Sequence, residues 1–446
     1  MMQSIDNPYG HRGPIEDPGD FYGRTDVLSQ LFECIRTRRC IALIGERRSG
    51  KTSILFQITH RDVQSKYLVN PDDCLFAYIN GEKVESPHAF FQQLFELITM
   101  QVPSFTIQWS DQLPISEVSI LLQRLRPRKL VVLFDEFDHI VAQKVFSPGA
   151  FYQLRSLAQE LKSVSCDVSF IIVTKRDLAD DLVHEIETDD LARAVTYCLN
   201  IFNKCFIGSF SPAELQSFLN ETSRRTGVPI LQYKQQIEDL AGRFPFFVQI
   251  ACYYYFDALV KNSQSPDHTL IRHKFMDEAR SHFSYIWSHL DDHERGLVIT
   301  LAAKERIPED TLWPLARKGY AIDGNLFSSA FAEFVLQIEK GGPVPKQGVF
   351  VDEQSGDVWV EGKLVDPPLA ELEYKLLAYL YKRCNQICTR DDIAIAVWGE
   401  QAIEGVTDAQ IDQLVRRVRL GIEPDPANPR YIETLRGRGH RLKRSP

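Results

Sequence analysis

The residues with the clearest chemistry stand at positions 45–52, which read GERRSGKT and match the spacing G-x-x-x-x-G-K-[ST]. An apolar run at 40–44 precedes them and an amphipathic helical pattern follows, so the motif has the strand–loop–helix setting that it needs. In such a loop the glycines allow backbone N–H groups to surround a β-phosphate, and Lys51 reaches the β- and γ-phosphates. We expect Thr52 to hold Mg²⁺. The alternative, an incidental glycine-containing loop, leaves the flanking elements unexplained.

Two acidic residues follow a second apolar run, in RKLVVLFDEFDHI. Residues 130–134 are predicted to form a buried strand, and Asp135 and Glu136 stand at its C-terminal end, where open parallel sheets bind ligands. We expect Asp135 to meet Mg²⁺ through water and Glu136 to position and polarise the attacking water. Asp138 is interpreted as a solvated residue at a helix start, with a place near the metal as the alternative. Taken alone, the acidic pair could also be a helix cap.

A third apolar run, in VSFIIVTKRD, ends in polar residues. In many such sheets this strand lies between the two motif strands, and a polar residue at its end can sense the γ-phosphate. We therefore add Thr174 to the candidate catalytic residues, with Lys51, Asp135 and Glu136. The alternative is an ordinary threonine at a strand end, because threonine is common in strands.

The C-terminal region concentrates basic residues that could bind a polyanion. TDAQIDQLVRRVRLGIE predicts a helix with Thr407 as its N-cap and an apolar face flanked by Gln413 and arginines. Residues 431–435 and 440–442 can pair as short strands, with RGRG as the glycine-containing turn between them. The arginines of this turn would project from a protruding tip. A solvated basic face is the alternative interpretation.

The chain as a whole has the balance of a globular protein. Of its 446 residues, 44% are hydrophobic and 25% are charged, and the length predicts two to four domains. The net charge of -9 argues against a general nucleic-acid coat, so the C-terminal basicity is local. The nine cysteines are scattered without a C-x-x-C pair, which favours reduced thiols over a metal site. We find no apolar run of membrane-spanning length and no signal-peptide core, and we expect a cytoplasmic protein without membrane contact.

These patterns predict an α/β P-loop NTPase core with a parallel sheet, followed by a helical lid and α+β winged-helix domains. A Ser-Pro helix entry at 211–212, with Glu214 completing a capping box, marks the start of the lid helices. A glycine- and proline-rich stretch, EKGGPVPKQG, reads as a linker. The predicted domains are an N-terminal arm (1–20), the nucleotide-binding domain (21–208), the lid (209–280), a first domain that resembles a winged helix (281–340) and a second winged-helix domain (341–446).

The first part of the chain resembles the AAA+ and STAND class of P-loop ATPases, in the branch similar to archaeal and origin-recognition ATPases. FYGR, at 21–24, is similar to that branch's F-x-G-R motif near the adenine, and AGRFPFFVQ is similar to its G-x-x-P lid motif. The resemblance implies ATP or ADP with Mg²⁺. The implied nucleotide contacts are Phe21, Gly23, Arg24, Gly45, Ser49, Gly50, Lys51, Thr52, Ser53 and Pro245. The glutamate that often follows F-x-G-R is absent, and Arg176 and Arg193 are only candidates for an arginine finger.

The last domain is similar to the OmpR/PhoB-type winged-helix DNA-binding domain. LAELEYKLLAYL, TRDDIAIAVWG, DQLVRRVR and YIETLRGRGHRL carry this resemblance. It implies that the 407–420 helix enters the major groove of double-stranded DNA and that the hairpin reaches the minor groove. The implied DNA contacts are Gln413, Arg416, Arg417, Arg419, Thr434, Arg436 and Arg438. His440 stands where the family more often has tyrosine, and we interpret it as packed beside the hairpin rather than as a pH sensor.

The combination predicts a transcriptional regulator whose nucleotide state controls its conformation or assembly, and thereby its DNA binding. ATP hydrolysis would be slow and serve as a timer, and a homo-oligomer is expected on nucleotide or DNA binding. The main alternative is an AAA+ ATPase of a mobile element or defence system that loads on DNA and recruits an effector protein. A static scaffold with a degenerate ATPase is a weaker alternative, because Lys51, Asp135 and Glu136 are intact.

Overall fold

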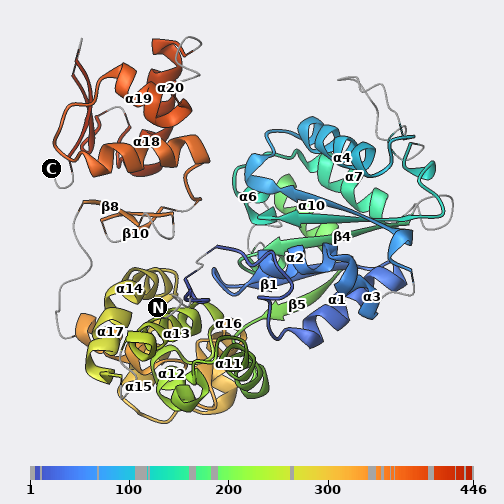
Figure 1. The fold of residues 1–446 in the computed structure, drawn as a ribbon. Helices are drawn as coiled ribbons and strands as arrows, with labels where there is room; N and C mark the ends of the chain where they lie inside the picture. The colour runs from blue at the N-terminus through green and yellow to red at the C-terminus, as the bar shows by residue number, and fades with distance from the viewer. Residues whose placement is uncertain are drawn as a thin grey trace, which may run out of the picture. The chain divides into compact units, whose positions relative to one another are not determined.

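A computed structural model gives the fold of the chain (Figure 1). It describes residues 6–10, 13–67, 70–105, 118, 121–159, 167–181, 189–261, 266–339, 348–352, 356–361, 363–365, 367–399, 406–426, 428–435 and 438–443. The chain divides into two compact units. The first consists of Met1–Asp267 and Asp310–Asp323, and the second of His268–Glu309 and Gly324–Pro446.

The first unit contains a five-stranded parallel sheet, in the order β2-β3-β4-β1-β5 (Figure 1). Its strands are β1 (Cys40–Gly45), β2 (Cys74–Asn80), β3 (Lys129–Asp135), β4 (Asp167–Thr174) and β5 (Phe202–Ile207). The strand before the phosphate loop and the strand before the acidic pair both pair with β4. This order confirms the predicted α/β core and brings the ends of β1, β3 and β4 to one edge, where such sheets bind ligands.

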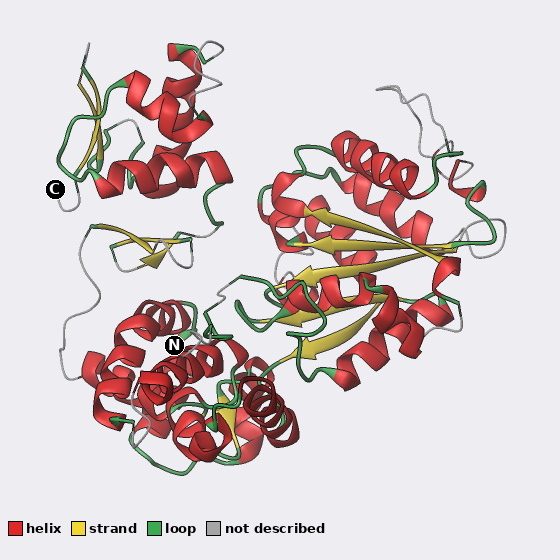
Figure 2. Ribbon diagram, in the orientation of Figure 1, coloured by secondary structure: helices red, strands yellow, loops and turns green. Residues whose placement is uncertain are grey.

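Helices cover both faces of the sheet, as Figure 2 shows. Alternate residues of β1 belong to different buried clusters, with Cys40, Ala42 and Ile44 on one face and Ile41 and Leu43 on the other. Each fully buried aliphatic side chain contributes about 1.5–3 kcal/mol relative to exposure, so the two clusters fix the sheet from both sides. The covering helices are α4 (Pro87–Gln101), α6 (Phe137–Ala142), α7 (Pro148–Gln159) and α10 (Asp190–Leu199) on the first face and α1 (Thr25–Thr37), α2 (Lys51–Thr59) and α3 (Arg61–Tyr67) on the second.

Helices also make up the part of the first unit that follows the sheet. At the start of α11 (Pro212–Thr226), Ser211 Oγ accepts a hydrogen bond from Glu214 N (3.2 Å) and Glu214 Oε2 accepts one from Ser211 N (2.7 Å). This capping box confirms the predicted helix start. The helices of this part are α11 (Pro212–Thr226), α12 (Lys234–Ala241), α13 (Pro245–Lys261) and α16 (Trp313–Lys318). The short elements of the chain are α9 (Leu178–Asp181), η1 (Pro71–Asp73), η2 (Gly81–Lys83), η3 (Ile230–Tyr233), η4 (Glu309–Leu312), β6 (Ala321–Ile322) and β7 (Asn325–Leu326).

In its described residues, the second unit begins with helices and continues into the C-terminal winged-helix domain. The helices are α14 (His268–Ser288), α15 (Asp292–Ala302) and α17 (Ser329–Glu339). The winged-helix domain consists of β8 (Val349–Asp352), β9 (Asp357–Val360), β10 (Lys363–Leu364), α18 (Glu371–Lys382), α19 (Arg390–Trp398), α20 (Asp408–Ile422), β11 (Ile432–Leu435) and β12 (Gly439–Leu442). The expected domain at 281–340 contributes residues to both units, because 310–323 belong to the first.

The winged-helix domain contains two hairpins, of which the sequence predicts the second. β8 pairs with β9 antiparallel, and β11 pairs with β12 with Ile432 opposite Leu442 and Thr434 opposite His440. A single buried cluster, drawn from residues 349–442, joins both hairpins to α18, α19 and α20. The domain therefore has a core of its own. The predicted tip of the second hairpin includes residues 436 and 437, which lie outside the described residues.

Candidate nucleotide site and DNA-binding surface

The phosphate loop runs from the end of β1 to the start of α2, and its two glycines are required for different reasons. A Cβ at Gly45 would lie 2.6 Å from the carbonyl oxygen of Ile207, so glycine permits the close approach of β5. Gly50 has φ 93 and open space around it, so glycine permits its left-handed backbone. Together they shape the turn that delivers Lys51 to the first position of α2.

Lys51 is buried, and its ammonium group bonds the loop itself. Nζ donates to the carbonyl oxygens of Gly45 (2.6 Å) and Glu46 (2.9 Å). Burial lowers the pKa of Lys51, and the charges of Glu136 and Asp135 oppose that shift. The ammonium group thus lies among loop carbonyls and near the acidic pair. A phosphate group entering the loop would give it an anionic partner in place of neutral ones.

Thr52 and Asp135 are brought together across the sheet edge, as expected for two groups that share a metal ion. Thr52 Oγ1 donates to Asp135 Oδ2 at 2.8 Å, and Tyr78 OH donates to the same oxygen at 3.1 Å. Burial and the neighbouring charge of Glu136 raise the pKa of Asp135, while the Thr52 hydrogen bond opposes the rise. The sequence analysis assigned no role to Tyr78. Burial alternates along β2, and the place of Tyr78 on the partly exposed side of this strand is the signal that could have suggested one.

The donor set fits Mg²⁺. Hydroxyl and carboxylate oxygens are hard ligands, and Mg²⁺ is usually bound by one or two protein groups with phosphates and water completing its shell. Within the described ranges, no group of three or more His, Cys, Asp or Glu side chains forms a metal cage. Thr52 and Asp135 would therefore hold the ion together with a nucleotide. The fully buried hydroxyl of Ser49, which has no hydrogen-bond partner among the described atoms, is a further group that a ligand in the loop could satisfy.

The acidic pair continues into a cluster with Asp138 and a second lysine. Lys175 Nζ lies 3.6 Å from Glu136 Oε2 and 3.9 Å from Asp138 Oδ2. Burial raises the pKa of Asp138 to about 6, Lys175 opposes the rise and Glu136 adds to it. Asp138 is thus not the solvated residue expected from the sequence, but a largely buried group near the site. Sequence reasoning gave Lys175 no role.

Thr174 occupies the expected position, but its hydroxyl is engaged. It ends β4 opposite Ile44, and its Oγ1 donates to the carbonyl oxygen of Arg176 at 2.8 Å. The side chain is buried. Arg176 and Arg193, the two arginine-finger candidates, are both exposed.

Arg24 of the FYGR stretch is buried and links the phosphate loop to the end of β5. Its guanidinium donates to the carbonyl oxygens of Ser49 (3.1 Å), Gly208 (2.7 Å) and Ser209 (3.4 Å), and it lies 4.9 Å from the centre of the Phe210 ring. Burial lowers its pKa to about 10, so it stays charged at neutral pH. These contacts give Arg24 a role in the architecture of the site.

The other predicted nucleotide contacts lie around the loop. Gly23 precedes Arg24 with φ 71, and Phe21 packs partly buried against the core beneath the sheet. Pro245 begins α13, and the next residue, Phe246, has its ring 5.1 Å from the guanidinium carbon of Arg48 in the loop. The start of α13 thus approaches the phosphate loop.

The N-terminal arm lies against the helix that follows the loop. Ser53 Oγ accepts a hydrogen bond from Ile15 N (2.9 Å), and Gln57 Nε2 donates to the carbonyl oxygens of Ile15 and Glu16 at 3.1 Å each. On its other side, Tyr9 OH donates to Thr222 Oγ1 of α11 at 2.7 Å. The arm therefore joins α2 to α11, and the Ser53 hydroxyl is bonded to it.

A cavity of about 400 Å³ lies between the arm and α11. Three aromatic side chains contribute to its walls beside acidic and other polar groups, and the OH of one of them, Tyr22, is buried and has no hydrogen-bond partner among the described atoms. Aromatic faces with a few polar groups suit a flat heteroaromatic ligand. The cavity is lined by Pro8, Tyr9, Pro14, Ile15, Glu16, Asp17, Asp20, Tyr22, Phe218, Thr222, Arg225 and Gln249.

In the winged-helix domain, α20 is built as predicted. Thr407 Oγ1 accepts a hydrogen bond from Gln410 N (3.4 Å), and Gln410 Oε1 accepts one from Thr407 N (2.8 Å). The predicted apolar face is buried, and Gln413, Arg416 and Arg417 are exposed. Exposed residues that can donate hydrogen bonds along one helix suit contact with base edges and phosphates.

The remaining predicted DNA contacts differ in whether their side chains have partners within the domain. Arg419 donates through Nη2 to the carbonyl oxygen of Ile432 (2.7 Å) and to Thr434 Oγ1 (2.7 Å), so it fastens the hairpin to α20. Arg417 Nε lies 3.4 Å from Glu373 Oε1. Arg438 is exposed. The prediction for Arg436 falls outside the described residues.

His440 is buried at the second hairpin, in agreement with its interpretation as a packed residue. It is 1% exposed, and its backbone exchanges two hydrogen bonds of 2.9 Å with Cys388. Its Nε2 lies 3.5 Å from Asp412 Oδ1. Burial lowers the pKa of His440, and the charge of Arg390 adds to that effect. The imidazole is therefore neutral near pH 7.

The two arginines Arg419 and Arg416 are predicted to differ in their effect on stability. Arg419→Ala is expected to lower the free energy of unfolding of residues 341–446 by about 1–2 kcal/mol, because the Ile432 carbonyl loses a charge-assisted hydrogen bond. Arg416→Ala, on the exposed face of the same helix, is expected to stay within about 0.5 kcal/mol of the unaltered domain. Urea unfolding followed by circular dichroism measures both. Equal losses would contradict the fastening role of Arg419.

Removing the charge of Asp138 is predicted to stabilise the folded protein by an amount that depends on pH. Its pKa is raised from the ordinary value of 3.8 to about 6 in the folded protein, so the folded state binds the proton more tightly than the unfolded chain. The resulting loss of stability grows as the pH rises from about 4 to about 6 and is complete above that. Asp138→Asn is expected to raise the free energy of unfolding of the first unit by about 1–3 kcal/mol near pH 7.5, and by less near pH 5. Scanning calorimetry at both pH values measures the gain. A gain of the same size at both would contradict this account.

Comparison with known protein families matches two parts of the chain. Residues 37–306 match the family model described as Novel STAND NTPase 2. Residues 366–442 match the model described as Transcriptional regulatory protein, C terminal. The first match contains the phosphate loop and the acidic pair, and the second contains α20 and the second hairpin.

The C-terminal part is similar to curated bacterial regulators. It is 36% identical over 92 residues to the uncharacterized transcriptional regulatory protein YrkP of Bacillus subtilis, a match that covers 21% of this chain and 38% of that protein. It is 37% identical over 95 residues to the sensory transduction protein RegX3 of Mycobacterium tuberculosis, which covers 21% of this chain and 40% of that protein. The chain therefore spans about two fifths of the length of these relatives.

A Walker-type ATPase of Pyrococcus abyssi is similar in structure, with 15% identity and a TM-score of 0.48, over 74% of this chain and 99% of that one. No helix in the described part of the chain is long and apolar enough to cross a bilayer. Because the first family model covers more than half of the chain, this protein belongs to the Novel STAND NTPase 2 family, and it ends in a winged-helix domain of the transcriptional-regulator type.

Proposed function

We propose that this protein is a transcriptional regulator that binds and slowly hydrolyses ATP, and that its nucleotide state controls how its C-terminal domain binds double-stranded DNA. The proposal includes a cytoplasmic location and assembly into a homo-oligomer on nucleotide or DNA. It rests on the contacts that join the phosphate loop to residues 310–323. This segment belongs to the first unit, but in the sequence it lies between the two parts of the second unit.

In this proposal the phosphate loop holds ATP through its backbone N–H groups and Lys51, and Thr52 and Asp135 hold Mg²⁺. Bound Mg²⁺ would neutralise charge on the β- and γ-phosphates. Glu136, the next residue after Asp135, would orient the attacking water and accept its proton. The side chains of Lys51, Thr52 and Asp135 already converge, which supports this assignment.

The cavity beside the N-terminal arm is the proposed place for the base. It is lined by Tyr9, Tyr22 and Phe218, and the arm residue Ile15 both lines it and donates to Ser53, two positions after Lys51 in α2. A base in this cavity would contact the arm and α11 at once. Nucleotide binding would then draw the arm, α11 and α2 into one arrangement, which is how a lid reports occupancy.

The contact chain from the phosphate loop is the observation that carries the proposal. The Arg24 guanidinium, which can only donate, donates to the carbonyl of Ser49 in the loop and to those of Gly208 and Ser209 after β5. Ser209 Oγ in turn donates to the carbonyl of Gly319 at 3.2 Å. Gly319 lies within 310–323, which packs with the first unit although its flanking sequence belongs to the second.

Several contacts hold this inserted segment. The Arg317 guanidinium lies 5.0 Å from the Phe206 ring and 3.3 Å from Asp180 Oδ2. A Cβ at Gly319 would come within 3.0 Å of Ser209 N, so the approach depends on glycine. A change in the loop that moves Ser209 would therefore move 310–323. Because α15 precedes and α17 follows this segment in the chain, such a movement would also displace the ends of these two helices of the second unit.

On the DNA side, we propose that α20 enters the major groove with Gln413, Arg416 and Arg417 and that the second hairpin contacts the backbone or minor groove. Arg419 and Thr434 would act mainly by fixing the hairpin to the helix. Regulators with this type of domain bind DNA in groups of half-sites when they assemble, so control of assembly would control affinity.

Two variants of the nucleotide site test the proposal. Lys51→Ala is expected to abolish ATP binding, so that its DNA affinity is the same with and without nucleotide. Glu136→Gln is expected to bind ATP but to lose turnover, about a hundredfold or more, and to keep the ATP-state DNA affinity in ATP itself. Calorimetry, phosphate release and DNA titration at one salt concentration measure these properties. The proposal fails if Lys51→Ala keeps a nucleotide-dependent DNA affinity.

A further inference from the structure

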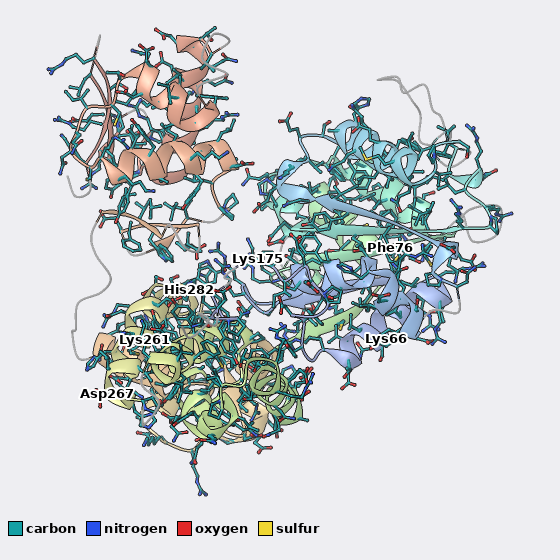
Figure 3. The ribbon with its side chains drawn as sticks, viewed as in Figure 1. Lys66, Phe76, Lys175, Lys261, Asp267 and His282 are labelled. Carbon is teal, nitrogen blue, oxygen red and sulfur yellow. The ribbon has the colours of Figure 1, made fainter. Side chains whose placement is uncertain are left out.

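Lys175 is the first residue after β4, and its ammonium group lies within the acidic cluster at the sheet edge. Nζ is 3.6 Å from Glu136 Oε2 and 3.9 Å from Asp138 Oδ2, and the side chain is 16% exposed. Figure 3 labels this lysine. A lysine that gives up most of its hydration beside two carboxylates is held there by their charge. The ion pair thus joins the end of β4 to the residues that follow β3.

The backbone on both sides of this ion pair is held in place. Glu136 has φ 49, in the left-handed region, at the start of α6. A Cβ at Gly81 would lie 2.5 Å from the carbonyl oxygen of Glu136, so the chain there packs tightly against η2. On the lysine side, the Thr174 hydroxyl donates to the carbonyl of Arg176, and the two residues flank Lys175. Fixed backbones leave the carboxylate of Glu136 as the part that still needs orientation.

Lys51 is not placed to orient it, because its own hydrogen bonds go to the loop. Its Nζ donates to Gly45 and Glu46. Within the described part of the chain, Lys175 is the cation in contact with the Glu136 carboxylate. The two lysines therefore serve different sides of the site: one faces the phosphate loop and the other faces the general base.

We propose that Lys175 is a positioning residue for ATP hydrolysis, which holds the Glu136 carboxylate in the orientation that receives a proton from the attacking water. This rests on the proposed ATPase function. In the step concerned, the water oxygen bonds to the γ-phosphorus, the bond to the β–γ bridging oxygen breaks, and Glu136 takes the proton. ADP and phosphate leave. Lys175 takes no proton and acts through Glu136.

The proposal is tested on the full-length protein with Lys175→Met, which keeps the length of the side chain but removes its charge. We expect kcat to fall about tenfold to a hundredfold, with KM and the affinity for a non-hydrolysable ATP analogue changed less than about twofold. Lys175→Arg is expected to restore kcat to within about fivefold of the unaltered protein. Lys66→Met, an exposed lysine on α3, is the control and should leave kcat unchanged.

A second measurement does not depend on turnover. Lys175→Met leaves the Glu136 charge without its cation, so its unfolding temperature is expected to fall, and Glu136→Gln in the same chain is expected to recover most of the loss. Unaltered kcat in Lys175→Met would overturn the inference, and so would a rise in KM that matches the fall in kcat, because that would place Lys175 on the nucleotide. If the unaltered protein shows no ATP turnover, the proposed function itself fails.

Discussion

The buried guanidinium of Arg24 is the interaction on which the proposed coupling depends. Burying a cation costs several kcal/mol unless hydrogen bonds and opposite charge replace its water. Here the replacements are three backbone carbonyls and the nearby charge of Glu214. The carbonyls come from the phosphate loop and from the chain after β5. Neither segment can move alone without leaving a charged donor unsatisfied, so their positions are tied.

The order of the strands brings the residues of the candidate site together. Because β4 lies between β1 and β3, the loop lysine, the acidic pair and the end of β4 meet at one edge. Parallel strands end at the same side, and their buried residues fix the register, so the Thr52–Asp135 contact follows from packing far from the site. The arm adds a second link, because it joins α2, the helix after the phosphate loop, to α11.

The sequence analysis predicted those features that depend on residues close together in the chain. The phosphate loop, the acidic pair after a buried strand, the Ser211 and Thr407 helix starts and the second hairpin depend on neighbours a few residues apart, and the structure has them. It could not assign Lys175 or Tyr78, because their roles arise from strand order. Arg419 was expected to face DNA from its place on the helix, but a partner in the hairpin, distant in sequence, engages its guanidinium.

The measurement that tests the central claim most directly is the DNA affinity of the full-length protein in ADP and in a non-hydrolysable ATP analogue, at one salt concentration, with Ser209→Ala alongside. The account predicts a clear difference between the two nucleotides for the unaltered protein, because the loop and the 310–323 segment are joined through Arg24 and Ser209. It predicts a smaller difference in Ser209→Ala, whose nucleotide affinity should be unchanged. Equal DNA affinity in both nucleotides for the unaltered protein would contradict the account.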